Sequence, residues 1–124
     1  MASSSSAPGT RFGPLEAEVM NVVWAAAGPV SVRDVAERLN DGRSEPLAYT
    51  TVMTVMSRLA QKHVLERRRE GRGYLYEPSA ADLAGLAVKN VIRTYGDEAM
   101  AHFVEEARAD PELLRRLQRL LGEQ

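Results

Sequence analysis

The sequence contains no cysteine, and only two of its 124 residues are histidines. Without cysteine the chain has no disulfide framework, zinc knuckle or iron–sulfur site, and a reducing cytoplasm is the expected compartment. The two histidines, His63 and His102, are far apart in the chain and lack a recognisable pattern of carboxylate ligands. We therefore expect neither a metal site nor a cofactor.

Long apolar runs are also absent. The longest nearly apolar run, Val19–Ala27, contains Asn21 and is far shorter than the roughly 20 residues that cross a bilayer. Residues 1–10 are rich in serine and lack the basic start and long apolar centre of a secretion signal. We expect a disordered tail over residues 1–11 and no stable association with a membrane.

Sequence motifs that carry catalysis are missing as well. The chain has no Gly-x-Ser-x-Gly nucleophile turn, no phosphate-binding Gly-Lys-Ser/Thr loop and no His-Glu-x-x-His helix. The Gly71-Arg72-Gly73 turn is too short to be a nucleotide-binding loop. Since no convergent set of titratable groups is apparent either, we do not expect an enzyme.

The charge of the chain is small in sum but uneven in distribution. Apolar residues make up 44% and charged residues 27%, as in ordinary globular proteins, and the formal net charge is −1. Arg58–Arg72 nevertheless holds six basic residues against two acidic ones, whereas residues 79–124 hold six against eight. Positive charge concentrated in one segment is typical of proteins that bind nucleic acid.

Apolar residues recur at helical spacing in three segments of the first half of the chain. The first segment begins at Pro14, a favourable first helical residue, and is stopped by Gly28 and Pro29. The second follows Ser31, which we expect to be its N-cap. The third segment runs from about Ala48 to His63. The sequence therefore predicts three helices before residue 64.

A β-hairpin is expected directly after the third helix. Val64–Arg69 and Tyr74–Glu77 have the composition of two short strands, and the turn between them contains Gly71 and Gly73. With a short extended piece at Val30, the order becomes helix, short strand, helix, helix, hairpin. This order predicts a mainly α fold with a small β-hairpin wing, the winged helix-turn-helix.

From Ser79 onward the pattern indicates helices alone. Residues 79–124 in three short helices bury too little surface to form a core of their own. Their spare apolar stripes imply a partner, most economically a second copy of the chain. We expect a winged-helix domain over residues 12–78 and a helical dimerisation domain over residues 79–124. The apolar residues expected at the dimer interface are Leu83, Leu86, Val91, Tyr95, Phe103, Leu113, Leu117, Leu120 and Leu121.

The third predicted helix has an apolar inner stripe and an outer face of hydroxyl side chains with Arg and Gln. A threonine-rich helix has low intrinsic propensity, so something other than helix formation accounts for these residues. In the major groove of DNA, hydroxyls bond to bases or phosphates and a methionine contacts a thymine methyl, while wing arginines add attraction to phosphates. The residues expected to contact DNA are Tyr49, Thr50, Thr51, Met53, Thr54, Ser57 and Arg58 on the helix, and Arg67, Arg68, Arg69, Arg72 and Tyr74 on the wing.

Several of the residues expected to contact DNA also have a purely structural explanation. Thr50 or Thr51 would cap the third helix, and Met53 would pack against the second helix. The Arg67-Arg68-Arg69 run would protect an exposed edge strand from aggregation. A winged helix also serves as a protein-interaction module without DNA, but that function calls for an apolar outer face on the third helix.

Four motifs carry a wider resemblance: Leu15-Glu16-Ala17-Glu18-Val19-Met20 with Val23-Trp24, Ala48-Tyr49-Thr50-Thr51-Val52-Met53-Thr54, Ser57-Arg58-Leu59, and Tyr74-Leu75-Tyr76-Glu77-Pro78. Together they resemble the BlaI/MecI/CopY family of penicillinase-type repressors, over about residues 12–122. The resemblance implies a homodimer that binds double-stranded DNA at a palindromic operator. It also implies that Thr50, Thr51, Met53 and Thr54 lie where the family's base-contacting residues lie.

The resemblance also suggests how DNA is released. In the β-lactam-responsive members, a membrane sensor leads to cleavage just before a phenylalanine that resembles Phe103. Those members have asparagine before the cut, whereas this chain has His102. The copper-responsive branch uses a C-terminal cysteine motif, which this chain lacks. Two mechanisms of release from DNA are therefore considered: cleavage between His102 and Phe103, and direct binding of a small-molecule effector.

Overall fold

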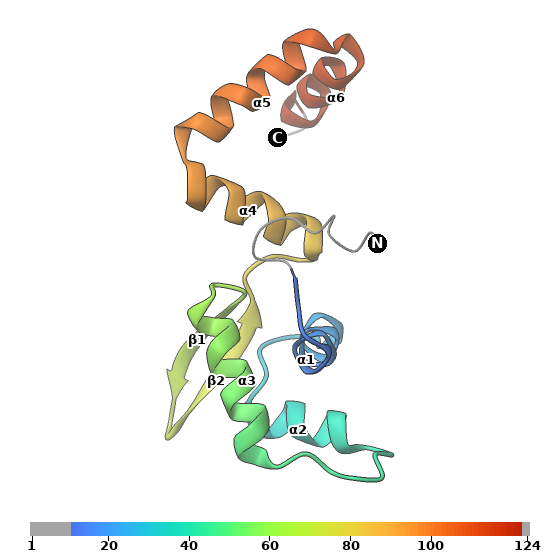
Figure 1. Cartoon of the computed structure of the whole chain (residues 1–124), viewed down its shortest axis with the longest axis vertical. Coiled ribbons are helices and arrows are strands. Elements are labelled where there is room, and N and C mark those ends of the chain that lie inside the picture. The colour runs from blue at the N-terminus through green and yellow to red at the C-terminus, as the bar shows by residue number, and fades with distance from the viewer. Residues whose placement is uncertain (1–10, 123–124) are drawn as a thin grey trace. The chain divides into compact units, whose positions relative to one another are not determined.

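A computed structural model of the chain describes residues 11–122, so the expected tail lies outside the described residues except for Arg11. The described chain divides into two compact units, one running through Ala87 and one starting at Val88. The elements are α1 (Pro14–Ala25), α2 (Val32–Asn40), α3 (Tyr49–Gln61), β1 (Leu65–Glu70), β2 (Gly73–Pro78), α4 (Leu83–Tyr95), α5 (Asp97–Ala109) and α6 (Pro111–Gly122) (Figure 1).

The first unit has the predicted order of helix, short strand, helix, helix and hairpin. β1 and β2 pair antiparallel, with Arg67 opposite Tyr76 and Arg69 opposite Tyr74. Val30, between α1 and α2, forms a β-bridge to Tyr76 on β2. Two backbone hydrogen bonds of 2.9 and 2.7 Å join these two residues and attach the hairpin to the helices. The predicted winged-helix architecture is therefore confirmed.

Local sequence explains where α1 and α2 begin. Pro14 is the first residue of α1, and the Glu16 side chain accepts a hydrogen bond from the Gly13 N–H at 3.0 Å. Ser31 caps α2 as predicted, because its hydroxyl accepts from the Asp34 N–H while the Asp34 carboxylate accepts from the Ser31 N–H. The backbone and hydroxyl hydrogen bonds of Ser31 lower the pKa of Asp34. Both helix starts are thus fixed by neighbouring side chains.

The core of the first unit is one cluster of buried apolar residues. Each of α1, α2 and α3 turns one face into it, and the hairpin adds Leu65 and Tyr76. Trp24 lies at the edge of the cluster and donates from its indole nitrogen to the Ala80 carbonyl at 3.0 Å. The fully buried side chains are Val19, Met20, Val23, Val35, Val52, Met56, Leu59, Val64, Leu65, Tyr76 and Leu86.

Leu86 is the one expected interface residue that the structure places elsewhere. It is 1% exposed and belongs to the core cluster of the first unit, because the first turns of α4 are part of that unit. Helical periodicity alone placed it with the dimerisation residues, and that expectation is wrong. Leu86 therefore contributes to the core of the winged-helix unit.

The second unit comprises the rest of α4 with α5 and α6. Gly96, with a φ of 59°, makes the turn between α4 and α5. Asp110 caps α6, since its carboxylate accepts from the Glu112 and Leu113 N–H groups at 3.1 and 3.2 Å. Within residues 11–122, no helix is both long enough and apolar enough to cross a membrane.

Candidate nucleic-acid interface

Helix α3 has one buried face and one exposed face. Val52, Met56 and Leu59 are fully buried and hold the helix on the core. Tyr49 is 53% exposed and Met53 39%, so Met53 is not packed away against α2. The other exposed side chains on this helix include Thr50, Thr51, Thr54 and Arg58, whereas Ser57 is half-buried. Apart from Tyr49 and Met53, the exposed face consists mainly of hydroxyl, amide and guanidinium groups.

The start of α3 leaves its threonines available. The N-cap residue is Ala48, and no side chain caps the helix there. Thr50 and Thr51 lie inside the first turn, so the alternative in which one of them is the N-cap is wrong. Since the N-cap is Ala48 and no side chain caps the helix, capping does not explain why this helix contains threonines.

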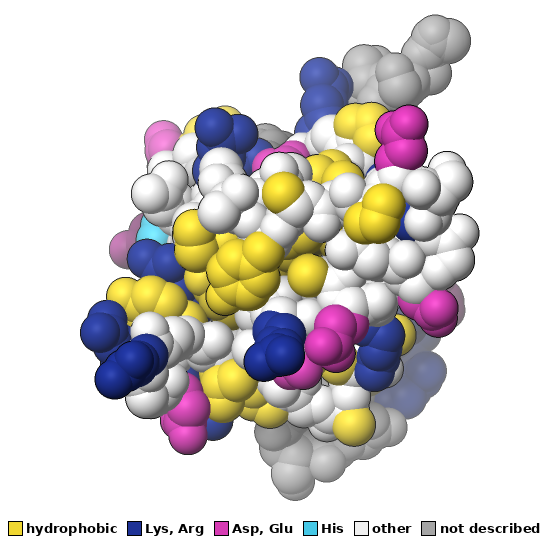
Figure 2. Space-filling view, turned by 90° about the horizontal axis from the view of Figure 1, so that it is seen from below, with side chains coloured by type: hydrophobic (Ala, Val, Ile, Leu, Met, Phe, Trp, Pro, Cys, Tyr) yellow, Lys and Arg dark blue, Asp and Glu magenta, His cyan; other side chains and the backbone are white. Residues whose placement is uncertain are grey.

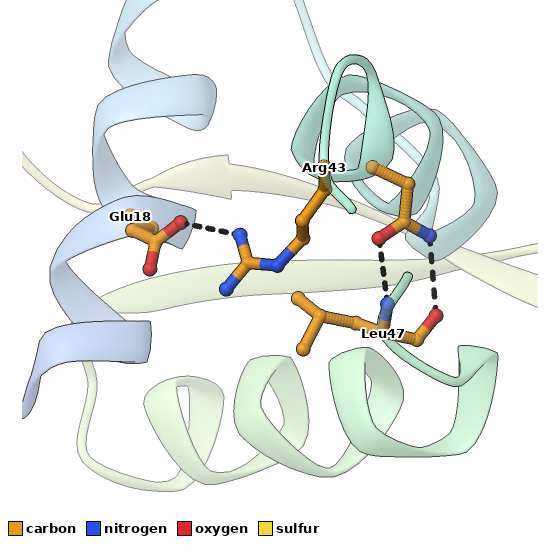
Figure 3. A network of polar contacts seen from close by, with 4 residues as sticks. Glu18, Arg43 and Leu47 are labelled. Atoms are coloured by element: carbon orange, nitrogen blue, oxygen red, sulfur yellow. Dashed lines mark hydrogen bonds and ion pairs between the residues drawn. The ribbon is translucent and has the colours of Figure 1, made fainter. Parts of the chain in front are cut away.

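A side-chain clamp holds the loop that leads into α3 (Figure 3). The Asn40 amide donates to the Leu47 carbonyl at 3.1 Å, and its oxygen accepts from the Leu47 N–H at 2.7 Å. Nearby, Arg43 donates to Glu18 on α1 at 2.9 Å. These two contacts span the loop between α2 and α3 and fix the direction from which α3 begins. Neither contact follows from local sequence patterns, because each joins residues that are distant along the chain.

The end of α3 is equally well tied. His63 follows the helix with a φ of 66°, and the Val64 N–H donates to the Leu59 carbonyl at 2.9 Å. The Ser79 hydroxyl lies 2.7 Å from the His63 carbonyl oxygen and 3.0 Å from that of Val64. A left-handed residue after a helix is a common helix ending, although it is usually Gly or Asn. Both ends of α3 are therefore fixed to the core of the unit.

Lys62, just after α3, forms an ion pair with Glu16 on α1, with 2.8 Å between Nζ and Oε2. Burial of the Glu16 carboxyl raises its pKa, but hydrogen bonds from Lys62 and the Gly13 N–H and the positive charges of Lys62 and Arg58 outweigh this effect. The pKa of Glu16 therefore lies below its ordinary value. This ion pair is a further link between α3 and α1.

The four arginines of the wing make different contacts. Arg67 donates to the Tyr76 hydroxyl at 3.3 Å and to the Ser57 hydroxyl on α3 at 3.5 Å. Arg68 lies 4.0 Å from Glu77, with both side chains largely exposed. Arg69 donates to the Tyr74 hydroxyl at 3.5 Å. Arg72 occupies the exposed turn between the strands.

Figure 2 shows the end of the first unit that carries α2, the loop before α3 and the tip of the hairpin. Basic side chains gather at the edge of the molecule where the hairpin lies. Elsewhere on this face, acidic and basic side chains are mixed around hydrophobic surface. The wing is thus a local region of positive charge on a chain of formal net charge −1.

The second unit exposes large apolar side chains on all three of its helices. Of the expected interface residues, Tyr95, Phe103, Leu120 and Leu121 are exposed, as is Leu83 at the start of α4. Three more are half-buried: Val91, Leu113 and Leu117. Five further exposed apolar residues of this unit were not among those expected at the interface, namely Val88, Ile92, Met100, Val104 and Leu114.

The bond between His102 and Phe103 lies in the middle of α5. Both side chains are exposed, and His102 Nδ1 is 3.5 Å from the Glu105 carboxylate one turn later. Among the residues that the structure describes, no group of three His, Cys, Asp or Glu side chains is arranged to hold a metal ion.

The chain is similar in sequence and in fold to known repressors of transcription. The family model described as penicillinase repressor matches residues 12–123. Two transcriptional regulators named BlaI, from two strains of Mycobacterium tuberculosis, are each 40% identical over 108 residues, covering 82% of this chain and 77% of theirs. A solution structure of the DNA binding domain of the repressor BlaI is 25% identical with a TM-score of 0.53, covering 62% of this chain and 90% of that domain.

Proposed function

Because this chain belongs to the penicillinase repressor family, we propose that it represses transcription as a homodimer bound to a palindromic operator in double-stranded DNA. Membership of a repressor family indicates that the chain is a transcriptional regulator and not an enzyme. The observation that carries the proposal is the exposed hydroxyl face of α3 beside an arginine-rich wing.

The two parts of this surface have different tasks. An α-helix fits the major groove, where Thr50, Thr51 and Thr54 reach base edges and Met53 contacts a thymine methyl. Tyr49, Ser57 and Arg58 lie on the same helix and contact phosphates or bases, which fixes its position in the groove. The exposed wing arginines, Arg68 and Arg72 among them, bind phosphates and supply affinity that depends on salt.

The exposed and half-buried apolar residues of α4, α5 and α6 support the homodimer. Exposed large apolar patches mark sites where proteins associate, and a two-fold axis covers the same patch on both copies. The side chains proposed at this interface are Leu83, Val91, Tyr95, Phe103, Leu113, Leu117, Leu120 and Leu121. Two-fold symmetry then requires two α3 helices in major grooves about one helical turn apart.

The experiment that tests this proposal is selection of duplexes from a random DNA library by the full-length protein. We expect enrichment of inverted repeats whose half-sites are centred about 10 base pairs apart. Two controls sharpen the result: the Thr51→Ala, Thr54→Ala variant is expected to lose the enrichment, whereas Glu37→Gln, on the outer side of α2, is expected to keep it. Failure of the wild-type protein to enrich any sequence would contradict the proposal.

For release, we propose a cut between His102 and Phe103 in response to a membrane sensor or a protease. The exposure of both side chains supports this site, and a cut there separates α6 from α4 and weakens the dimer. Direct release by a small-molecule effector is the competing mechanism. Mass spectrometry of the chain recovered from induced cells distinguishes them, because an intact chain contradicts proteolysis.

A further inference from the structure

Two wing arginines lie close to the ring of Tyr74 on β2, and the Tyr74 hydroxyl alone does not explain this arrangement. The guanidinium carbon of Arg67 lies 4.4 Å from the centroid of the Tyr74 ring, and that of Arg69 lies 5.5 Å from it. Both distances are within the range of cation–π attraction. The β-ladder explains the geometry, because Arg69 is directly opposite Tyr74 and Arg67 is its diagonal neighbour.

Arg67 connects this ring to the rest of the DNA-facing surface. Its guanidinium donates both to the hydroxyl of Tyr76, which is 1% exposed, and to the hydroxyl of Ser57 on α3. The Tyr74 and Tyr76 rings meet edge to face, with 6.3 Å between their centroids. A chain of contacts therefore runs from the core through Tyr76 and Arg67 to the half-buried ring of Tyr74.

We propose that Tyr74 is a positioning residue, whose ring orients the guanidinium groups of Arg67 and Arg69 before DNA binds. This inference rests on the proposed function, since it assumes that the wing approaches DNA. Arginine side chains have large rotamer freedom, and ordering them on binding lowers affinity. A ring that restrains two of them in the free protein reduces that loss. The Tyr74 hydroxyl adds only one hydrogen bond of 3.5 Å, from Arg69, so the proposal rests on the aromatic ring.

Two substitutions at position 74 distinguish the contribution of the hydroxyl from that of the ring. Tyr74→Phe keeps the ring and removes the hydroxyl, and we expect its Kd for the selected operator to stay within about two-fold of wild type. Tyr74→Leu removes the ring, and we expect binding to weaken by about two- to five-fold, the range of an exposed cation–π contact. The slope of affinity against salt stays unchanged in both variants, because no phosphate contact is removed.

A double-mutant cycle separates positioning from general loss of structure. In an Arg67→Ala, Arg69→Ala background, Tyr74→Leu is expected to produce no further loss of affinity. Equal losses from Tyr74→Phe and Tyr74→Leu would instead assign the role to the hydroxyl, as a donor to phosphate. Unchanged affinity of Tyr74→Leu, or additive losses in the cycle, would overturn the proposal.

A measurement without DNA keeps this proposal distinct from the proposed function. In the NMR spectrum of the free protein, the side-chain protons of Arg67 and Arg69 are expected to carry ring-current shifts, retained in Tyr74→Phe and lost in Tyr74→Leu. Arg72, in the hairpin turn, is the control whose shifts stay constant. Absence of these shifts in wild type would contradict the positioning role, whereas absence of DNA binding alone would contradict the proposed function.

Discussion

Asn40 at the end of α2 holds Leu47 by both groups of its side-chain amide, as donor to the carbonyl and acceptor from the N–H. The clamp closes a polar loop and leads directly into α3. An aspartate at position 40 retains the acceptor but has no amide donor, so the Leu47 carbonyl loses its partner. The clamp is thus a direct way to test what orients the start of α3.

We predict that Asn40→Asp lowers the free energy of unfolding by about 1 kcal/mol, the usual contribution of one hydrogen bond. Hydrogen exchange should also speed up at residues 41–50, where the loop and the first turn of α3 lie. Asn21→Asp, on the exposed side of α1, is the matched control. Equal stability and equal exchange in the two variants would show that the clamp does not orient α3.

His63 offers a prediction about stability, because it has a φ of 66° in a region that non-glycine residues rarely adopt. His63→Gly removes the steric strain of the side chain and is expected to stabilise the unit by up to about 1 kcal/mol. The same substitution at His102, in the middle of α5, is expected to destabilise its helix by roughly 0.3–0.5 kcal/mol, the difference in helix propensity between His and Gly. Chemical denaturation measures both, and a lower midpoint for His63→Gly would refute the strain argument.

The ion pair of Glu16 and Lys62 predicts a dependence of stability on pH. The pKa of Glu16 is lowered in the folded protein, so the carboxylate stabilises the fold above its ordinary pKa of 4.5, and this stabilisation is lost as pH falls through the lower folded value. Glu16→Gln should therefore lose less stability than wild type on acidification below about pH 4.5. Lys62→Met, which removes the partner, should behave similarly. Parallel acid-denaturation curves for wild type and both variants would exclude this contribution.

The proposed dimer predicts the effect of a charge on α6. Leu121 is 71% exposed, and Leu121→Glu places a carboxylate in the apolar surface that a second copy would cover. Sedimentation equilibrium should then show a monomer, while the first unit keeps its melting temperature. Gln118→Glu adds the same charge at another exposed position of α6 and should remain dimeric. A Leu121→Glu protein that still forms dimers would place the interface elsewhere.

Local signals in the sequence were sufficient for much of the winged-helix unit. The Ser31 cap, the glycines of the hairpin and the apolar stripes of the helices act over a few residues, so periodicity and capping rules predict them. Contacts between distant segments could not be predicted in this way. The amide of Asn40 reaches across a loop to Leu47, and this depends on how α2 and α3 pack.

Tyr74 and Leu86 show why side-chain roles are harder to predict. Tyr74 was expected to contact DNA from the wing, and its proximity to the guanidinium groups of Arg67 and Arg69 depends on the register of two strands, which the sequence does not reveal. Leu86 belongs to an apolar stripe of α4, and periodicity does not reveal which partner covers a stripe. The structure assigns it to the core of the first unit.

The division of work between α3 and the wing is tested most directly by comparing two double variants on the selected operator and on a scrambled duplex, at several salt concentrations. Thr51→Ala, Thr54→Ala is expected to reduce the preference for the operator by about ten-fold and leave the salt slope unchanged. Arg68→Ala, Arg72→Ala is expected to weaken binding to both duplexes alike and to reduce the slope by about two. If the threonine variant instead lost affinity equally for both duplexes, α3 would not read the sequence and the account would be contradicted.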